Sequence, residues 1–217
     1  MITGNLAKVK RILCLGAHCD DIEIGCGGTI LRLIADSDRI EFYWLVLCSN
    51  PERARESRQS ANAFLKRARK KTVVVKSFRD GFLPYTGAPV KECFEELKKS
   101  FSPDLIFTHF RQDLHQDHRL VCELTWNTFR NHLILEYEIP KYDADLHQPN
   151  FFVPLPDTIR RKKVRRLMRY FGTQRNKHWF SEDLFNGLMR LRGVEAASPT
   201  RYAEAFHCRK LILGAVR

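Results

Sequence analysis

Five short runs of apolar, β-branched and aromatic residues alternate with segments of helical spacing along the first part of the chain. The runs are residues 11–16 (RILCLG), 41–48 (EFYWLVLC), 71–76 (KTVVVK), 104–108 (DLIFT) and 133–137 (LILEY). The segments with helical spacing are residues 27–35, 52–68, 90–99 and 119–129, and Ser49-Asn50-Pro51 supplies a helix start before the second of them. Strands that alternate with helices pair in parallel through right-handed crossovers. The pattern therefore predicts an α/β fold with three layers and a mostly parallel central sheet.

The length of the chain limits how many domains it can form. Its 217 residues suffice for one sizeable core, so we expect a single domain over residues 1–217. Hydrophobic residues make up 44% and charged residues 29%, which is typical of globular proteins and argues against wholesale disorder. Beyond Glu138 several prolines interrupt a long connection, which we expect to wall a pocket rather than to form another domain.

The chain is strongly basic, with a formal charge of +12 from 37 Lys and Arg against 25 Asp and Glu. Such a surface attracts phosphate, sugar nucleotides, nucleic acid or acidic lipid headgroups, and it permits peripheral membrane contact. Residues 1–10 lack the apolar run of a secretory signal, and no apolar stretch approaches the roughly 20 residues that span a bilayer. Seven Cys without a C-x-x-C pair fit reduced thiols. We therefore expect a cytoplasmic protein that is not transmembrane.

A polar segment, Ala17 to Asp21 (A-H-C-D-D), follows the first predicted strand. Active loops of α/β sheets lie at the carboxyl ends of the strands, so this segment falls where a site is expected. Imidazole and carboxylate groups bind zinc in catalytic sites that have three protein ligands and an open position. Two adjacent carboxylates then suggest that one binds the metal and the other acts on water. Taken alone the string is weak evidence, because a loop in which Asp caps the next helix explains it as well.

A second polar segment, Asp113 to His118 (D-L-H-Q-D-H), follows the fourth predicted strand. Two His three positions apart lie on the same side of a helical turn, and neighbouring Asp residues can hold their tautomers. A polar loop that happens to contain His explains this segment equally well. However, both segments fall on the same edge of the predicted sheet, and neither has the apolar spacing of a core element. Together they favour a metal site.

These residues resemble the motifs of the LmbE-like or PIG-L de-N-acetylases, zinc enzymes that deacetylate conjugates containing N-acetylglucosamine. A-H-C-D-D is similar to the family's A-H-P-D-D block, with Cys19 in place of Pro, and H-Q-D-H is similar to its H-x-D-H block. Further similarity lies in residues 53–62, 78–81, 138–155, 192–194 and 202–206. The resemblance implies a Rossmann-like, three-layer α/β fold with the active site at the carboxyl ends of the strands.

The resemblance also implies a metal-dependent amide hydrolase that releases an N-acetyl group. It implies His18, Asp21 and His118 as the zinc ligands and Asp20 as the general base on the attacking water. A protonated His115 would stabilise the charge that develops on the acetyl oxygen. Asp117 would orient His115 and raise its pKa, because a neighbouring carboxylate favours imidazolium.

Substrate contacts are expected from Arg53, Asp80 and Glu204. Arg53 can grip a phosphate or a pair of hydroxyls, although a surface ion pair with Glu56 explains it equally. Asp80 and Glu204 can bind sugar hydroxyls, and helix capping or support of other site residues explains them as well. The substrate implied is an amino sugar or a glycoconjugate, anionic in view of the basic surface, with a role in polysaccharide biosynthesis. A homo-oligomer is compatible with the sequence.

Two other functions fit parts of the sequence. A nucleic-acid-binding protein would use the basic segment at residues 158–171 (TIRRKKVRRLMRYF), which a solvated helix over an apolar stripe explains more simply. A nucleotide-binding protein would use Gly25-Cys26-Gly27-Gly28, but this cluster lacks the spacing of the phosphate-binding motifs, and tight turning beside the metal is a simpler use. We therefore expect no nucleic-acid partner.

Overall fold

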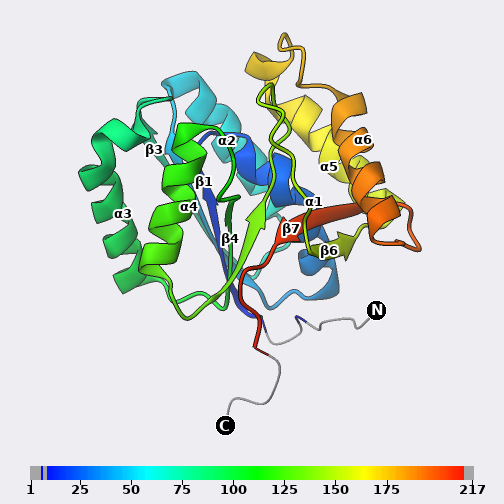
Figure 1. Ribbon diagram of the computed structural model, residues 1–217, viewed down its shortest axis with the longest axis horizontal. Helices are drawn as coiled ribbons and strands as arrows, with labels where there is room; N and C mark the ends of the chain where they lie inside the picture. The colour runs from blue at the N-terminus through cyan, green and yellow to red at the C-terminus, as the bar shows by residue number, and fades with distance from the viewer. Residues whose placement is uncertain (1–5, 7–8, 213–217) are drawn as a thin grey trace.

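The computed structural model describes Leu6 and residues 9–212. Most of residues 1–10, in which no secretory signal was expected, therefore lie outside the described residues. A seven-stranded sheet with the order β3-β2-β1-β4-β5-β7-β6 runs through this part of the chain (Figure 1). Its strands are β1 (Arg11–Gly16), β2 (Glu41–Cys48), β3 (Lys70–Phe78), β4 (Leu105–His109), β5 (Leu133–Tyr137), β6 (Phe151–Pro154) and β7 (Ala203–His207). The first five are parallel, and β7 runs antiparallel to both β5 and β6.

Helices cover both faces of the sheet. One face carries α1 (Asp21–Asp36), α2 (Pro51–Phe64), α5 (Asp157–Tyr170) and α6 (Glu182–Glu195), and the other carries α3 (Gly87–Ser100) and α4 (Gln116–Thr128) (Figure 1). Two short 3₁₀ helices, η1 (Leu83–Thr86) and η2 (Gly172–Gln174), lie in the connections. The predicted three-layer α/β fold with a mostly parallel sheet is confirmed.

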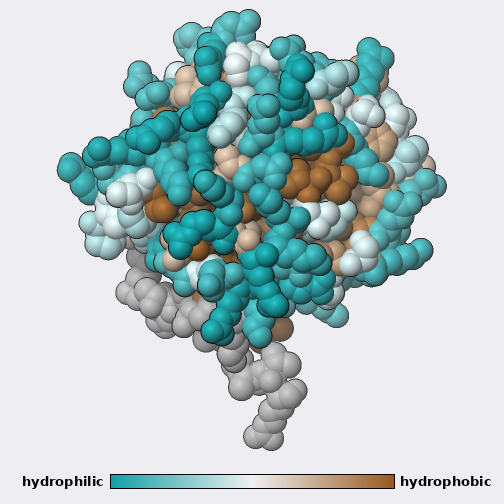
Figure 2. All heavy atoms as spheres, turned by 180° about the vertical axis from the view of Figure 1, so that it is seen from behind, coloured by the Kyte–Doolittle hydropathy of each residue, from teal (hydrophilic) through white to brown (hydrophobic). Residues whose placement is uncertain are grey.

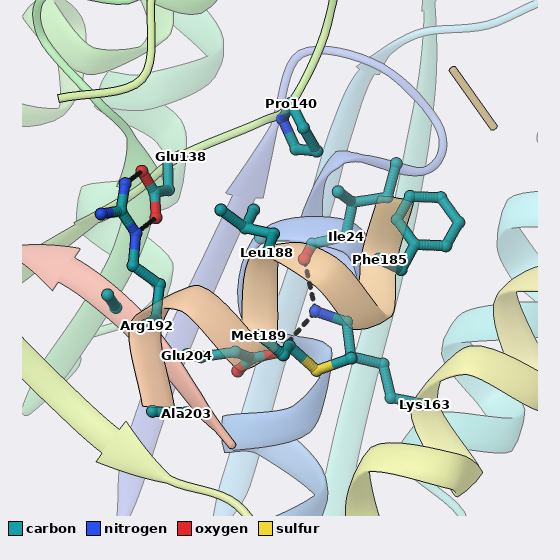
Figure 3. A pocket seen from close by; sticks show the side chains of 12 residues that line it. Ile24, Glu138, Pro140, Lys163, Phe185, Leu188, Met189, Arg192, Ala203 and Glu204 are labelled. Atoms are coloured by element: carbon teal, nitrogen blue, oxygen red, sulfur yellow. Dashed lines mark hydrogen bonds and ion pairs between the residues drawn. The ribbon is translucent and has the colours of Figure 1, made fainter. Parts of the chain in front are cut away.

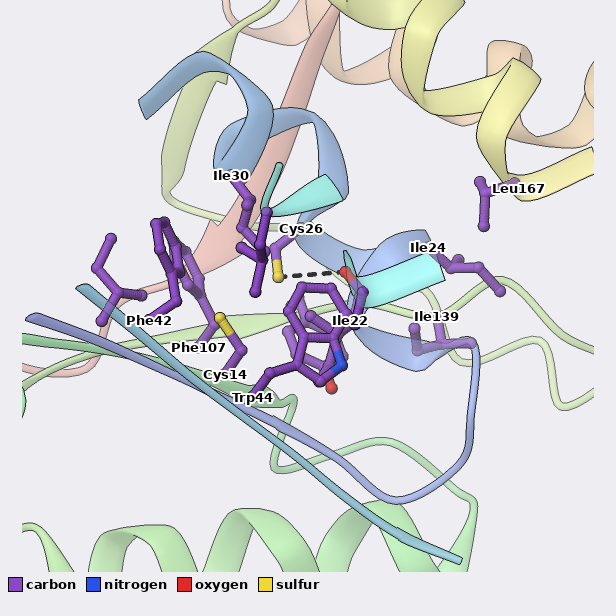
Figure 4. Packing of buried hydrophobic residues seen from close by; sticks show 14 of the residues in the cluster. Cys14, Ile22, Ile24, Cys26, Ile30, Phe42, Trp44, Phe107, Ile139 and Leu167 are labelled. Atoms are coloured by element: carbon purple, nitrogen blue, oxygen red, sulfur yellow. Dashed lines mark hydrogen bonds between the residues drawn. The ribbon is translucent and has the colours of Figure 1, made fainter. Parts of the chain in front are cut away.

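Alternate residues of β1 build the two halves of the core. Ile12 and Cys14 belong to the cluster that packs under α1, and Figure 4 shows Cys14 in it together with Trp44 of β2. Leu13 and Leu15 point to the opposite face, where they meet α3 and α4. Successive side chains of a strand face opposite sides of a sheet, so a strand covered by helices on both sides must be apolar throughout. This is the physical reason why the central strands are unbroken apolar runs.

All five predicted strands are present, but two strands and one helix beyond residue 138 were not predicted. Strand β6 lies in the proline-interrupted connection, and α6 and β7 lie in later residues for which the sequence analysis predicted no helix or strand. The predicted helices also begin too late, because α1 starts at Asp21 rather than at residue 27 and α4 at Gln116 rather than at residue 119. The first turns of both helices hold polar residues of the two motifs, so apolar spacing does not mark them.

The strand order reverses between β1 and β4. From β1 the chain enters α1 on one face, and from β4 it enters α4 on the other, so the two loops diverge at the carboxyl edge of the sheet. Such a switch point opens a crevice in which α/β proteins bind their ligands. Both polar motifs lie here, at the ends of neighbouring strands.

The basic segment forms α5, whose apolar stripe enters the core through Val164, Leu167 and Phe171 at its end. The face of the molecule seen in Figure 2 is largely hydrophilic, with apolar side chains in smaller separate areas. All seven cysteines are unpaired, as expected for reduced thiols. Among the described residues, no helix combines the length and the apolar character needed to cross a bilayer.

Candidate metal centre

Three nitrogen and oxygen donors from the two motifs converge at the switch point. His18 lies in the loop after β1, Asp21 is the first residue of α1, and His118 lies in the first turn of α4. His18 Nδ1 is 3.0 Å from His118 Nε2 and 3.4 Å from Asp21 Oδ2, and His118 Nε2 is 3.6 Å from Asp21 Oδ1. The structure thus brings together side chains that are up to 100 residues apart in the sequence.

This spacing fits a zinc ion. Donors placed 2.0–2.2 Å from zinc at tetrahedral angles lie about 3.3–3.6 Å from one another, close to the distances found. Burial raises the pKa of Asp21, but His118, His109 and His18 outweigh this effect, so its pKa lies well below the usual value and the group is a carboxylate. Burial lowers the pKa of His118 to about 3, which leaves a neutral imidazole as metal binding requires. The geometry of the three donors and the charge states of Asp21 and His118 therefore suit a divalent cation.

A carboxylate and a lysine hold the ring of His118 in place. His118 Nδ1 lies 2.9 Å from Asp113 Oδ2, and Asp113 Oδ1 lies 3.0 Å from Lys141 Nζ. Lys141 also contacts Asp145, whose carboxylate accepts a bond from the backbone N–H of Leu114. Histidine ligands commonly donate their second ring nitrogen to a carboxylate, which fixes the tautomer and leaves the other nitrogen free for the metal. The contacts from Lys141 through Asp113 to His118 therefore direct His118 Nε2 at the candidate metal position.

Asp117 supports His18 instead of the His115 side chain. Its Oδ2 lies 3.2 Å from His18 Nε2 and accepts a bond of 2.7 Å from the Gly81 N–H, while its Oδ1 accepts one of 3.1 Å from the Leu83 N–H. The prediction that the Asp117 carboxylate orients His115 is corrected by this arrangement, whereas its charge does raise the pKa of His115, against the larger effects of burial and of His18. Asp117 lies in the first turn of α4 and its side chain points back toward the loop after β3, away from the N-cap.

His115 is the N-cap of α4 and faces the same cluster. Its Nδ1 accepts a bond of 3.2 Å from the backbone N–H of Asp117, so the remaining proton of a neutral ring lies on Nε2. Burial, and then the charge of His18, lower the pKa of His115, which differs from the protonated state that the sequence predicted. Its ring centroid lies 4.7 Å from that of His18 and 4.6 Å from that of His118. A neutral ring with an Nε2 proton can still donate a hydrogen bond to a substrate oxygen.

Asp20 is a buried carboxylate with one oxygen held and one oxygen free. Its Oδ1 accepts a bond of 2.6 Å from Arg53, whereas its Oδ2 has no hydrogen-bond partner among the residues that the structure describes. Burial raises the pKa of Asp20, and Arg53 opposes this rise. Arg53 also donates to Thr173 Oγ1, and Glu56 accepts from the same hydroxyl and from the Thr173 N–H. Arg53 and Glu56, expected as a possible ion pair, are thus joined through Thr173.

The two remaining predicted substrate residues lie in different surroundings. The Asp80 side chain is 78% exposed and its Oδ1 lies 3.1 Å from His18 Nε2, so it contacts the side of the His18 ring that faces away from the candidate metal position. Glu204 is only 4% exposed, and its carboxylate accepts bonds from the N–H groups of Gly28 and Thr29. It also binds the Nζ of Lys163 (Figure 3). The cavity beside it measures about 20 Å³, which admits one water molecule. Glu204 therefore has the structural role that was the alternative to sugar binding.

His109 is a site residue that the sequence analysis missed. It is fully buried at the end of β4, its Nε2 lies 3.1 Å from Asp21 Oδ2, and its ring stacks on His118 at 3.8 Å. Donor atoms of Asp21, His109 and His118 lie within 4.8 Å of one another, as do those of His18, His115 and His118. The sequence did offer a signal for this residue, because His109 is a metal-binding residue type at the carboxyl end of the apolar strand β4.

Close packing explains the glycine cluster, and the Cys19 thiol is bonded to a backbone carbonyl. The glycines lie inside α1, and a Cβ at Gly25 would come within 2.2 Å of Tyr137 Cδ2, so the cluster forms neither a phosphate loop nor the expected tight turn. The Cys19 thiol is buried and donates to the carbonyl of Cys48. Burial raises its pKa to about 12, so it is a protonated core residue, as a tolerated spacer would be.

The sequence and the fold of this chain are similar to those of known proteins. A family model described as GlcNAc-PI de-N-acetylase matches residues 13–129, which include both motifs. Among solved structures, the N,N′-diacetylchitobiose deacetylase from Pyrococcus horikoshii superposes with a TM-score of 0.72 at 21% identity. That alignment covers 92% of this chain and 84% of the deacetylase.

Two further structures share the fold at lower identity. The A40926 pseudoaglycone deacetylase Dbv21 has a TM-score of 0.65 and 15% identity, with 94% of this chain and 99% of that chain covered. GalB, the 4-carboxy-2-hydroxymuconate hydratase from Pseudomonas putida KT2440, has a TM-score of 0.69 and 16% identity, with 96% and 99% covered. At these identities the likeness shows the fold alone, and the same fold carries different reactions.

Proposed function

Because the chain belongs to the GlcNAc-PI de-N-acetylase (PIG-L, LmbE-like) family, we propose that it is a zinc-dependent hydrolase that removes the N-acetyl group from an N-acetylglucosamine-type sugar or glycoconjugate. One observation supports this most strongly. His18, Asp21 and His118 present donor atoms 3.0–3.6 Å apart, and beside them Asp20 offers an oxygen without a hydrogen-bond partner among the described residues. A metal position beside a free carboxylate is the arrangement that metal-assisted amide hydrolysis requires.

The three donor residues would hold the zinc ion, which when bound supplies a Lewis acid that polarises the acetyl carbonyl and acidifies water. Asp20 would take the proton of the attacking water on Oδ2, since Arg53 occupies Oδ1. Its raised pKa makes it a stronger base than an exposed Asp. Asp20 would then return this proton to the nitrogen of the departing amine.

His115 would donate a hydrogen bond from its Nε2–H group to the acetyl oxygen as negative charge develops there, and would keep the proton. A preorganised donor at such a position stabilises the transition state more than the ground state. Asp117 and Asp113 would keep the rings of His18 and His118 in orientation through their second nitrogens.

The sugar would enter from the side on which Asp80 is exposed. We propose that Asp80 binds hydroxyl groups there, and that the excess of basic residues favours an anionic conjugate such as a nucleotide-linked or lipid-linked sugar. Arg53 would act on the substrate only through Asp20, because its guanidinium is engaged in the interior.

The test is release of free amine by the purified, zinc-loaded protein from a panel of compounds. The panel holds N-acetylglucosamine, its nucleoside diphosphate conjugate and its alkyl glycosides. We expect amine release from at least one member, and loss of that release after removal of zinc with a chelator. If no member releases amine while the protein carries one zinc ion per chain, the deacetylase proposal is rejected. Because the fold also carries a hydratase, amine release is the discriminating signal.

A further inference from the structure

A second group of donor atoms lies on the other side of the His18 ring. While Nδ1 of His18 faces the candidate zinc position, Nε2 lies 3.2 Å from Asp117 Oδ2 and 3.1 Å from Asp80 Oδ1. Cys48, the last residue of β2, places its Sγ 3.9 Å from Asp117 Oδ2. Donor atoms of His18, Cys48 and Asp117 all lie within 4.8 Å of one another.

We propose that His18, Cys48, Asp117 and Asp80 form a second divalent-cation site that prefers thiophilic ions such as Zn²⁺ and Cd²⁺ and shares the His18 imidazole with the first site. His18 Nε2 lies 3.2 Å from Asp117 and 3.1 Å from Asp80, close to the roughly 3.3 Å between nitrogen and oxygen donors on one ion, and the sulfur of Cys48, with its longer metal bond, lies farther from Asp117 at 3.9 Å. A thiolate selects soft ions, which carboxylates and imidazole alone do not. This inference does not depend on the reaction that the first site catalyses.

The surroundings of these donors suit a cation that comes from solvent. Cys48 is 2% exposed and Asp117 is fully buried, whereas Asp80 is open to solvent and provides the approach. The carboxylates of Asp117 and Asp80 both face one ring nitrogen, so negative charge is concentrated there. The N–H groups of Gly81 and Leu83 hold Asp117 in place, which keeps its Oδ2 directed at the shared position.

Binding of the ion requires two deprotonations. Bonds form from the ion to His18 Nε2, Cys48 Sγ and one oxygen each of Asp117 and Asp80. The thiol proton of Cys48 and the Nε2 proton of His18 pass to solvent, so the ring then bridges two ions as an imidazolate. Two carboxylates and a thiolate offset the charge of the second ion.

The experiment starts from protein that carries one zinc ion per chain and adds Cd²⁺. Cadmium bound to a thiolate absorbs in the near ultraviolet through charge transfer from sulfur, and metal analysis after gel filtration counts both ions. We expect one Cd²⁺ to add while zinc is retained, together with the charge-transfer band. The variant Cys48→Ser should lose the band and bind the second ion at least about tenfold more weakly, as loss of a ligand costs no less than loss of a supporting partner.

Matched variants separate this site from other thiols. Cys19→Ser removes the neighbouring thiol, which donates to the Cys48 carbonyl, and Cys93→Ser removes a partly exposed thiol on α3, so both should keep the band. Asp80→Asn changes an exposed side chain that does not support the fold and should weaken Cd²⁺ binding even if Cys48→Ser fails to fold. A band that persists in Cys48→Ser, replacement of zinc by cadmium without a band, or unchanged affinity in Asp80→Asn would each overturn the proposal. None of these signals requires amide hydrolysis, so failure of the deacetylase assay leaves them unaffected.

Discussion

The guanidinium of Arg53 donates to Asp20 Oδ1 over 2.6 Å and thereby joins helix α2 to the loop after β1. The sequence predicted that Arg53 contacts the substrate, whereas in the structure it holds a buried carboxylate. The contact leaves Oδ2 of Asp20 as the oxygen available to a substrate water. The geometry of the proposed base therefore depends on a residue from another helix, and through Thr173 on the loop that follows α5.

Replacement of Arg53 by Met is expected to shift the pH dependence of hydrolysis. Burial raises the pKa of Asp20 and Arg53 opposes this, so removal of Arg53 should raise the pKa further. The base must be ionised, and the acidic limb of kcat/KM against pH should therefore move to higher pH, with about a tenfold loss of rate on that limb. Arg53→Lys keeps the charge and should move the limb less. An acidic limb at the same pH in both variants would remove Arg53 from this role.

Replacement of Asp20 by Asn should abolish most of the activity without removing the metal. Loss of a general base costs about a hundredfold or more in rate, while the donors of His18, Asp21 and His118 are unchanged. Amine release and zinc content should be measured on the same preparation. Wild-type turnover in this variant would exclude Asp20 as the base, and loss of zinc would instead point to Asp20 as a ligand.

Replacement of Lys141 by Met should weaken zinc binding. Lys141 lies 3.0 Å from Asp113, which orients His118, and loss of such supporting groups typically raises the dissociation constant about 10-fold to 100-fold. Competition with a chromophoric chelator measures the constant. Lys141→Arg keeps the charge and should restore part of the affinity. As a control, Lys91→Met removes an ion pair with Glu95 on the surface of α3 and should leave zinc binding unchanged.

Substitution of two helical glycines by Ala should have opposite effects on stability. A Cβ at Gly25 would lie 2.2 Å from Tyr137 in the core, so Gly25→Ala should lower the free energy of unfolding by about 1–3 kcal/mol. At Gly187 of α6 a Cβ meets no atom of the described structure within 4 Å, and Gly187→Ala should raise it by about 0.5–1 kcal/mol. Urea denaturation of both variants provides the comparison. Equal changes in the free energy of unfolding for the two variants would show that the close approach of α1 to Tyr137 does not require glycine at position 25.

Replacement of Lys163 by Met should destabilise the fold strongly. Lys163 and Glu204 form a buried ion pair of 2.6 Å between α5 and β7, and removal of one partner of such a pair costs about 3–5 kcal/mol. The double variant Lys163→Met with Glu204→Gln should recover part of this loss, because no charge stays buried and the amide oxygen can still accept the bond from Gly28 or the bond from Thr29. If the loss of unfolding free energy in the double variant equals the sum of the losses in the two single variants, Lys163 and Glu204 are not energetically coupled and the prediction is wrong.

Much of the fold followed from the sequence because its signals are local. An apolar run between helical segments marks a central strand whatever its neighbours, so β1 to β5 were predicted. Strands β6 and β7 were not, since β6 has four residues at half-buried positions beside prolines and its pairing with β7 joins residues about 50 positions apart. The edge of the sheet on which the motifs lie was predicted for the same local reason.

The sequence by itself determined which chemical groups this protein brings to the carboxyl edge of its sheet, because strand ends and residue types are fixed by local pattern. Only the tertiary structure decided how these groups are paired. It placed Asp117 on His18, Arg53 on Asp20, and Glu204 inside the core. A carboxylate can bind any donor within reach, and which donors come within reach depends on how separate loops and helices pack against one another.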